Sequence, residues 1–171
     1  MSVLVIDTVG FVGTHLSLAL KKHGDGVVGI DNFNSYYDPS LKKARQSLLK
    51  THSVFIVKGD INDNRLLDKL FDTVAFTHVM HLAAQAGVQY AIENPCSNIT
   101  GLVMLLEVCK SANPQSSIVW ASSSSVYDMT QKNIKNVANI ILTSAHVKLP
   151  SGARAVTNPR AFPSGLLGLA H

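Results

Sequence analysis

The sequence predicts an α/β fold, namely an incomplete Rossmann-type, doubly wound parallel sheet of about five strands with an irregular C-terminal tail. Short apolar runs alternate with amphipathic stretches along most of the 171 residues, which is typical of strands and helices that take turns in such a sheet. A glycine pair, Gly10 and Gly13, follows the first apolar run, and Asp31 ends the second. This order of strand, glycine loop, helix, strand and acid is typical of a dinucleotide-binding βαβ unit.

The first two strands enclose a helix. Residues 3–6 are almost all apolar, which indicates a strand that is buried on both faces of a parallel sheet. The helix after the first strand is expected to end at Gly24, and residues 27–30 are expected to form the second strand. The expected apolar face of this helix consists of Phe11, Val12, Leu16, Leu18, Ala19 and Leu20.

Three further strands and three further helices follow. The segment Asp38-Pro39-Ser40 can start a helix over 40–49. We expect this helix to carry three basic side chains outward, those of Lys42, Lys43 and Arg45. Asn62 or Asp63 can cap another helix that runs to Phe71, and apolar spacing predicts a helix from about Ser97 to Lys110. The remaining strands are expected at 53–57, 78–82 and 117–121.

The composition changes after residue 127, so we predict a dinucleotide-binding domain over 1–127 and an unrelated tail over 128–171. The net charge is +4, and the tail alone accounts for it with five basic residues against one acid. Val137–Leu142 could form a strand or a short helix. Residues 143–171 are rich in proline and glycine and are expected to be mostly irregular.

Several classes of protein are excluded by composition. The positive charge is diffuse and lacks interleaved aromatic residues, so nucleic-acid binding is not expected. No apolar run reaches the length of a membrane span, and no signal peptide precedes the first strand, so the chain as given is expected to be soluble and cytoplasmic. The two cysteines, Cys96 and Cys109, form neither a disulfide framework nor a metal site.

Polar residues gather where the predicted strands end, which is where ligands bind in open α/β sheets. Gly10 and Gly13 would let backbone amides approach a pyrophosphate at a helix N-terminus, although a plain turn is the alternative. Asp31 would accept hydrogen bonds from a ribose hydroxyl, which favours NAD over its 2′-phosphorylated form. Asp60 would bond an adenine amino group. Either aspartate could instead be a turn or capping residue.

The segment 122–125 consists of four serines after the fifth strand. One of these hydroxyls could donate a hydrogen bond to a developing oxyanion, and a simple polar loop is the alternative. His81 lies inside a strand and is expected to be a satisfied core residue. Trp120 and Tyr127 are expected to pack rather than to catalyse.

Long segments of the chain resemble plant-type UDP-glucuronate 4-epimerases. These enzymes are extended short-chain dehydrogenases/reductases of the NAD-dependent epimerase/dehydratase group. The resemblance covers residues 1 to about 127. The segments that carry it are GFVGTH, DNFNSYYDPSLKKAR, GDIND, FTHVMHLAAQAGVQYAIENP, NITGLVMLLEVCKSANPQ and IVWASSSSVY.

The resemblance implies an NAD-dependent epimerase that converts UDP-glucuronate to UDP-galacturonate. NAD would accept a hydride from C4 of the sugar while a tyrosinate takes the hydroxyl proton, and the hydride would return to the other face. Ser123 would supply the catalytic serine hydroxyl. The cofactor-binding residues that it implies are Gly10, Phe11, Val12 and Gly13 at the pyrophosphate, Asp31 and Asn32 at the ribose, Asp60 and Ile61 at the adenine, and Leu82, Ala83 and Ala84 along the cofactor.

Four departures from the family pattern predict impaired activity. Asp7 stands where the family has its first loop glycine, and its charge is expected to weaken NAD binding. The run between ENP and the next helix is a few residues shorter. No tyrosine is followed four residues later by a lysine, so the catalytic Tyr-x-x-x-Lys pair is absent. The sixth strand, the helix with that pair and the sugar-binding domain are missing, and residues 128–171 resemble nothing in the family.

Three interpretations of the whole chain remain open. It could be an epimerase by descent with little or no activity. It could instead be a non-catalytic partner or regulator of a full-length epimerase, although the family's homodimer interface is expected to be incomplete. It could also be an unstable product, because the fifth strand would leave an unpaired sheet edge. Plant-type members are anchored in the Golgi membrane, whereas this chain shows no membrane segment.

Overall fold

The computed structural model describes residues 1–84, 97–113, 116–121, 145–147 and 155–157. Several residues singled out from the sequence lie outside the described residues. They are Cys96, Ser122–Ser125, Tyr127 and Val137–Leu142.

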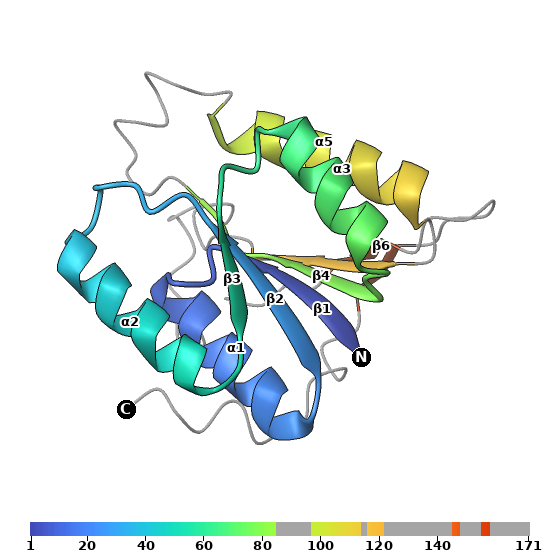
Figure 1. Ribbon diagram of the computed structural model, residues 1–171. Helices are drawn as coiled ribbons and strands as arrows, with labels where there is room; N and C mark the ends of the chain where they lie inside the picture. Colours follow the sequence, from blue (N-terminus) through green and yellow to red (C-terminus); the bar gives the residue numbers. More distant parts are fainter. Residues whose placement is uncertain (85–96, 114–115, 122–144, 148–154, 158–171) are drawn as a thin grey trace, which may run out of the picture.

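A parallel sheet of five strands forms the centre of the molecule (Figure 1). These five strands lie in the order β3-β2-β1-β4-β5, and β1 pairs in parallel with both β2 and β4. The order reverses at β1, which is the topological switch point of a doubly wound sheet. The five parallel strands are β1 (Ser2–Ile6), β2 (Gly26–Asp31), β3 (Phe55–Lys58), β4 (His78–His81) and β5 (Ser117–Trp120).

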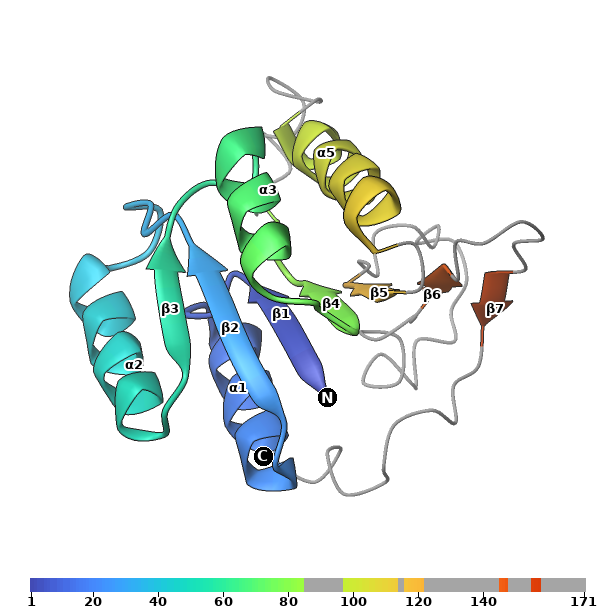
Figure 2. The same ribbon diagram turned by 45° about the vertical axis from the view of Figure 1, so that its right-hand side comes forward.

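Helices cover both faces of the sheet, as predicted for a doubly wound fold. Helices α1 (Phe11–His23) and α2 (Pro39–Thr51) lie on one face, and α3 (Asn64–Thr73) and α5 (Ser97–Ala112) lie on the other (Figures 1 and 2). Each predicted helix is therefore present, and α2 and α5 each extend about two residues beyond the expected C-terminal end. The Rossmann-type fold class is confirmed.

Alternating residues of β1 divide the core into two clusters. Leu4 and Ile6 join the cluster that includes Leu67 of α3 and Leu105 of α5. Val3, Val5 and Val9 join the second cluster with Leu49 of α2. Each of these named residues of the two clusters is at most 2% exposed. Both faces of β1 are thus buried, which explains the uninterrupted apolar run that predicted this strand.

The prediction of the apolar face of α1 is partly wrong. Phe11 is 67% exposed and Val12 is 46% exposed. Instead, the small residues Gly13, Thr14 and Ser17 are the buried residues of this helix. The leucines of α1 are only half-buried beside the second cluster. A Cβ atom at Gly13 would overlap the Asp7 carbonyl, so α1 begins close to the end of β1, and its leucines add partly buried contacts to the second cluster.

Two short strands lie within the segment that the sequence predicted as irregular. Strand β6 (Ala145–Val147) pairs antiparallel with β5, and β7 (Ala155–Thr157) pairs antiparallel with β6. Ile118 of β5 lies opposite Val147. The edge of β5 is therefore paired at Ile118, where the sequence predicted an unpaired edge.

Candidate functional site

A cavity of about 240 Å³ opens at the carboxyl ends of the parallel strands. It lies across β1, β2 and β4, which is the switch point where open α/β sheets bind ligands. Six of its fourteen lining residues are aspartate or asparagine, and most of the others are apolar. The lining residues are Ile6, Asp7, Ile30, Asp31, Asn32, Asn34, Gly59, Asp60, Ile61, Asn62, His81, Ala83, Ala84 and Gly101.

The glycine loop joins β1 to the N-terminus of α1. Gly10 is the N-cap residue of α1, and no side chain caps this helix end. The first amides of α1 are therefore available for an anion, as in many phosphate sites. A Cβ atom at Gly13 would overlap the backbone carbonyl of Asp7, and one at Gly10 would overlap the Asp7 carboxyl group. The structure thus requires glycine at position 13, where the overlap is with backbone, whereas at position 10 the Asp7 side chain would have to move.

Asp7 occupies the centre of this loop in a left-handed backbone conformation, with φ of 66°. This conformation favours glycine, and aspartate is one of the few other residues that adopt it. Burial and the adjacent carboxylate of Asp31 raise the pKa of Asp7 to about 7. A hydrogen bond with Asp31 adds to this increase in the pKa, whereas the cations of Lys42 and Arg45 lower the pKa of Asp7.

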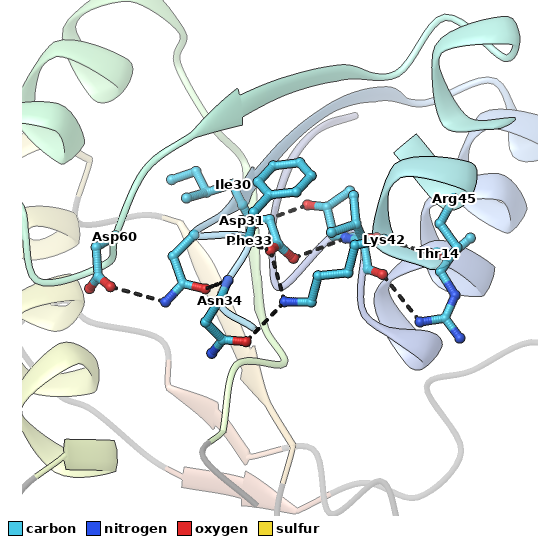
Figure 3. A network of polar contacts seen from close by, with 11 residues as sticks. Thr14, Ile30, Asp31, Phe33, Asn34, Lys42, Arg45 and Asp60 are labelled. Carbon is cyan, nitrogen blue, oxygen red and sulfur yellow. Dashed lines mark hydrogen bonds and ion pairs between the residues drawn. The ribbon is translucent and has the colours of Figure 1, made fainter. Parts of the chain in front are cut away.

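Asp31 is the hub of the polar network at the end of β2 (Figure 3). Its Oδ2 atom accepts a hydrogen bond from the backbone N–H of Val9 at 3.2 Å, and Oδ1 accepts one from Phe33 N–H at 2.8 Å. Lys42 Nζ lies 3.3 Å from Oδ1. Asp31 therefore ties the glycine loop, its own turn and α2 together, which agrees with the turn interpretation, while its role toward a ribose hydroxyl stays a prediction.

Lys42 does not point outward, which corrects the prediction for α2. It is 4% exposed, and its ammonium group bonds Asp31 and the Asn34 side chain. Arg45 also turns inward in part, because it donates to the carbonyl of Val9 at 3.3 Å and stacks over the Phe11 ring at 5.8 Å. Lys43 is exposed as expected. Helical spacing alone did not predict which of these three cations points inward.

Asp60 lies at the other side of the cavity (Figure 3). It accepts hydrogen bonds from the Asn32 amide at 3.1 Å and from the Asn62 backbone at 2.9 Å. These contacts, led by the Asn62 N–H, lower the pKa of Asp60. Asp60 does not cap α3, because the N-cap residue is Asp63, whose side chain accepts from Leu66 N–H. An ionised acceptor is thus held at the cavity wall.

His81 is buried at the end of β4 and lines the same cavity. Its Nδ1 atom has no hydrogen-bond partner among the described residues. The expectation of a fully satisfied core histidine is therefore not met. Burial lowers its pKa to about 4, so the ring is neutral at physiological pH.

The structure brings most of the predicted binding residues to one cavity. Gly10 and Gly13 form the adjoining loop, whereas Phe11 and Val12 expose their side chains at the start of α1 and do not line the cavity. Leu82 is half-buried and lies beside the second core cluster. Ser123 lies outside the described residues. The sequence argument missed Asn34, Asn62 and Gly101 as lining residues, and only the run of amide residues after each strand could have indicated the first two.

Comparison with known proteins agrees with this geometry. The family model described as GDP-mannose 4,6 dehydratase matches residues 4–138. The chain is 69% identical over 136 residues to UDP-glucuronate 4-epimerase 1 of Arabidopsis thaliana, and this alignment covers 77% of the chain and 32% of that protein. It is 37% identical over 161 residues to Protein CapI of Staphylococcus aureus, covering 92% of the chain and 46% of CapI. That alignment reaches into 128–171, for which the sequence suggested no relative.

Solved structures resemble the described fold. A variant of UDP-glucuronic acid 4-epimerase from Bacillus cereus, in complex with a fluorinated UDP-glucuronic acid and NAD, matches with a TM-score of 0.68 and 31% identity over 84% of this chain and 47% of that one. UDP-glucose-4-epimerase from Stenotrophomonas maltophila, with bound NAD, matches with a TM-score of 0.65 and 28% identity over 78% of this chain and 40% of that one. The chain therefore spans about a third of the length of the plant relatives and less than half of the length of these structures.

Within the part of the chain that the structure describes, no helix is both long and apolar enough to span a bilayer.

Proposed function

Because this chain belongs to the GDP-mannose 4,6 dehydratase family, we propose that it is an NAD-binding, UDP-glucuronate 4-epimerase-like protein with little or no turnover as given. The observation that carries this proposal is the cavity at the switch point, where Asp31 and Asp60 stand at the ends of neighbouring strands. Identity of 66–70% to six plant UDP-glucuronate 4-epimerases supports the same substrate class.

The adenosine half of NAD would lie against the described cavity, whose aspartate and asparagine side chains offer acceptors for its hydroxyl and amino groups. Asp31 and Asn32 would hold the ribose, because both present oxygen acceptors at the cavity wall. Asp60 and Ile61 would border the adenine. The uncapped N-terminus of α1, from Gly10 to Gly13, would face the pyrophosphate. Leu82, Ala83 and Ala84 follow β4 and would border the remaining part of the cofactor. When bound, NAD supplies a hydride acceptor.

The proposal of low activity follows from the absent tyrosine and lysine pair. A general base that takes a sugar hydroxyl proton near neutral pH needs a lowered pKa. Ser123 is the one member of the family's catalytic set that the resemblance assigns to this chain, and a serine alone cannot serve as that base. The residues four places after the chain's tyrosines are Ser40, Leu41, Asn94 and Gln131.

An activity assay tests this proposal. We expect the purified protein, supplied with UDP-glucuronate and NAD, to form UDP-galacturonate at least about a hundredfold more slowly than an intact plant-type epimerase, since general acid–base groups contribute about 10²–10⁴-fold. Product is measured by chromatography of the nucleotide sugars. Turnover within a few-fold of the intact enzyme would contradict the proposed inactivity.

A non-catalytic partner of a full-length epimerase is the second candidate function. It is favoured by the outer surface of α5, where Ile99 is 61% exposed and Val103 is 50% exposed one turn later. Two adjacent exposed apolar side chains on one helix can contribute to an interface. Co-purification with an intact epimerase, lost in a double variant with Ile99→Glu and Val103→Glu, would support this role. The absence of any complex would count against it.

A further inference from the structure

Asp7 is the feature of the site that the proposed function does not use. Its side chain lines the cavity and lies over Gly10, so a carboxyl group stands beside the unfilled amides of the α1 N-terminus. Its backbone N–H is bonded to Ile30 O at 2.9 Å, and its carbonyl accepts from Gly10 N–H at 3.0 Å. These bonds fix the backbone of Asp7, so the residue as a whole moves only if the loop rearranges.

Charged groups surround Asp7 from each neighbouring element. Asp31 lies beside it at the end of β2, and Lys42 and Arg45 approach it from α2. His81 of β4 and Asp60 after β3 line the same cavity. The two cations are engaged elsewhere, Lys42 with Asp31 and Asn34 and Arg45 with Val9. An ionised Asp7 would therefore add a second negative charge beside Asp31 at the position where an anionic ligand must enter.

We propose that Asp7 makes dinucleotide binding proton-linked, so that the loop accepts a pyrophosphate group only when the Asp7 carboxyl is protonated. This proposal rests on the proposed function, because it assumes that the cavity binds NAD. The neutral acid presents no charge to the loop, and the neighbouring Asp31 carboxylate favours this neutral form. The ionised acid repels the pyrophosphate at short range, where the interaction is weakly screened.

The direction of the pH dependence follows from linkage. Asp7 in the free protein changes charge near pH 7, whereas the bound pyrophosphate would hold it protonated to higher pH. The dissociation constant for NAD is therefore expected to be nearly constant below pH 6 and to rise toward tenfold per pH unit above 7. Between pH 6 and pH 8.5 this amounts to a weakening of roughly 30-fold.

Calorimetric titration of NAD into the whole chain between pH 6 and 8.5 tests the proposal, with Asp7→Asn and Asp7→Gly as matched variants. Asparagine keeps the size and the donor to Asp31 and tolerates a positive φ, but it cannot ionise. We expect both variants to change affinity less than about threefold over this range. At pH 8, titrations in buffers of different ionisation enthalpy should show uptake of about one proton by the parent and none by Asp7→Asn.

The outcomes separate this proposal from the proposed function. A parent and an Asp7→Asn variant that bind NAD with the same pH dependence would overturn the proton link and leave the cofactor assignment intact. Absence of binding by the parent and by both variants at every pH, with folding verified by thermal melting, would overturn the cofactor assignment and the proton link with it.

Discussion

Replacing Lys42 by methionine is expected to lower the free energy of unfolding by about 3 kcal/mol. Lys42 and Asp31 form a buried ion pair, with side-chain exposures of 5% and 1%. Methionine keeps the aliphatic stem but removes the charge, so the Asp31 carboxylate stays buried without its counter-ion. Loss of one partner from such a pair costs about 3–5 kcal/mol. The lower end applies here because the Val9 and Phe33 amides still donate to Asp31.

Lys43→Met is the matched control for this experiment. Lys43 is the next residue of α2 and is exposed, so the same chemical change should alter stability by less than about 0.5 kcal/mol. Urea denaturation followed by circular dichroism measures both variants. Equal effects of the two substitutions would show that the buried pair is not an important source of stability.

The second prediction concerns the stability of the Asp7→Asn variant as a function of pH. The folded-state pKa of Asp7 is raised from 3.8 to about 7, so the folded protein binds a proton more tightly than the unfolded chain. The contribution of Asp7 to stability is therefore complete below about pH 4, falls as the pH rises to about 7, and is constant above that value. Asparagine cannot ionise, so the free energy of unfolding of the variant does not decrease in this way as the pH rises.

Asp7→Asn is thus expected to match the parent near pH 4 and to be more stable by roughly 2 kcal/mol at pH 8, after allowance for the part of the carboxyl that solvent screens. Thermal and urea melts at both pH values measure the difference. Asp68→Asn, an equivalent change on the exposed surface of α3, should show no such pH-dependent gain. A variant that is less stable than the parent at pH 8 would contradict the assigned protonation of Asp7.

Much of the fold could be predicted because its signals are local. Continuous apolar runs identified strands buried on both faces, as in β1, and Gly24 correctly marked the end of α1, where it adopts a φ of 94°. The apolar face of α1 could not be predicted in the same way. Close packing against the sheet selected Gly13, Thr14 and Ser17, and hydrophobicity carries no signal for a face made of small residues.

The candidate site could be predicted only in part. Asp31 and Asp60 each follow a strand, and parallel strands bring their carboxyl ends to one edge, so their gathering follows from the order of elements. The buried position of Lys42 does not, because its partner lies 11 residues away, in another element. The assignment of Ser123 and the division at residue 127 stay predictions.

The sequence by itself determined the order of strands and helices, the place of the cofactor-type loop and the absence of a Tyr-x-x-x-Lys pair, since each depends on residue type and spacing alone. Only the tertiary structure decided the state of Asp7. From the sequence it was a carboxylate expected to repel an anion, whereas in the fold its pKa is raised to about 7 by burial and by Asp31. The physical reason is that its pKa depends on burial and on a charge 24 positions away, which only folding brings beside it.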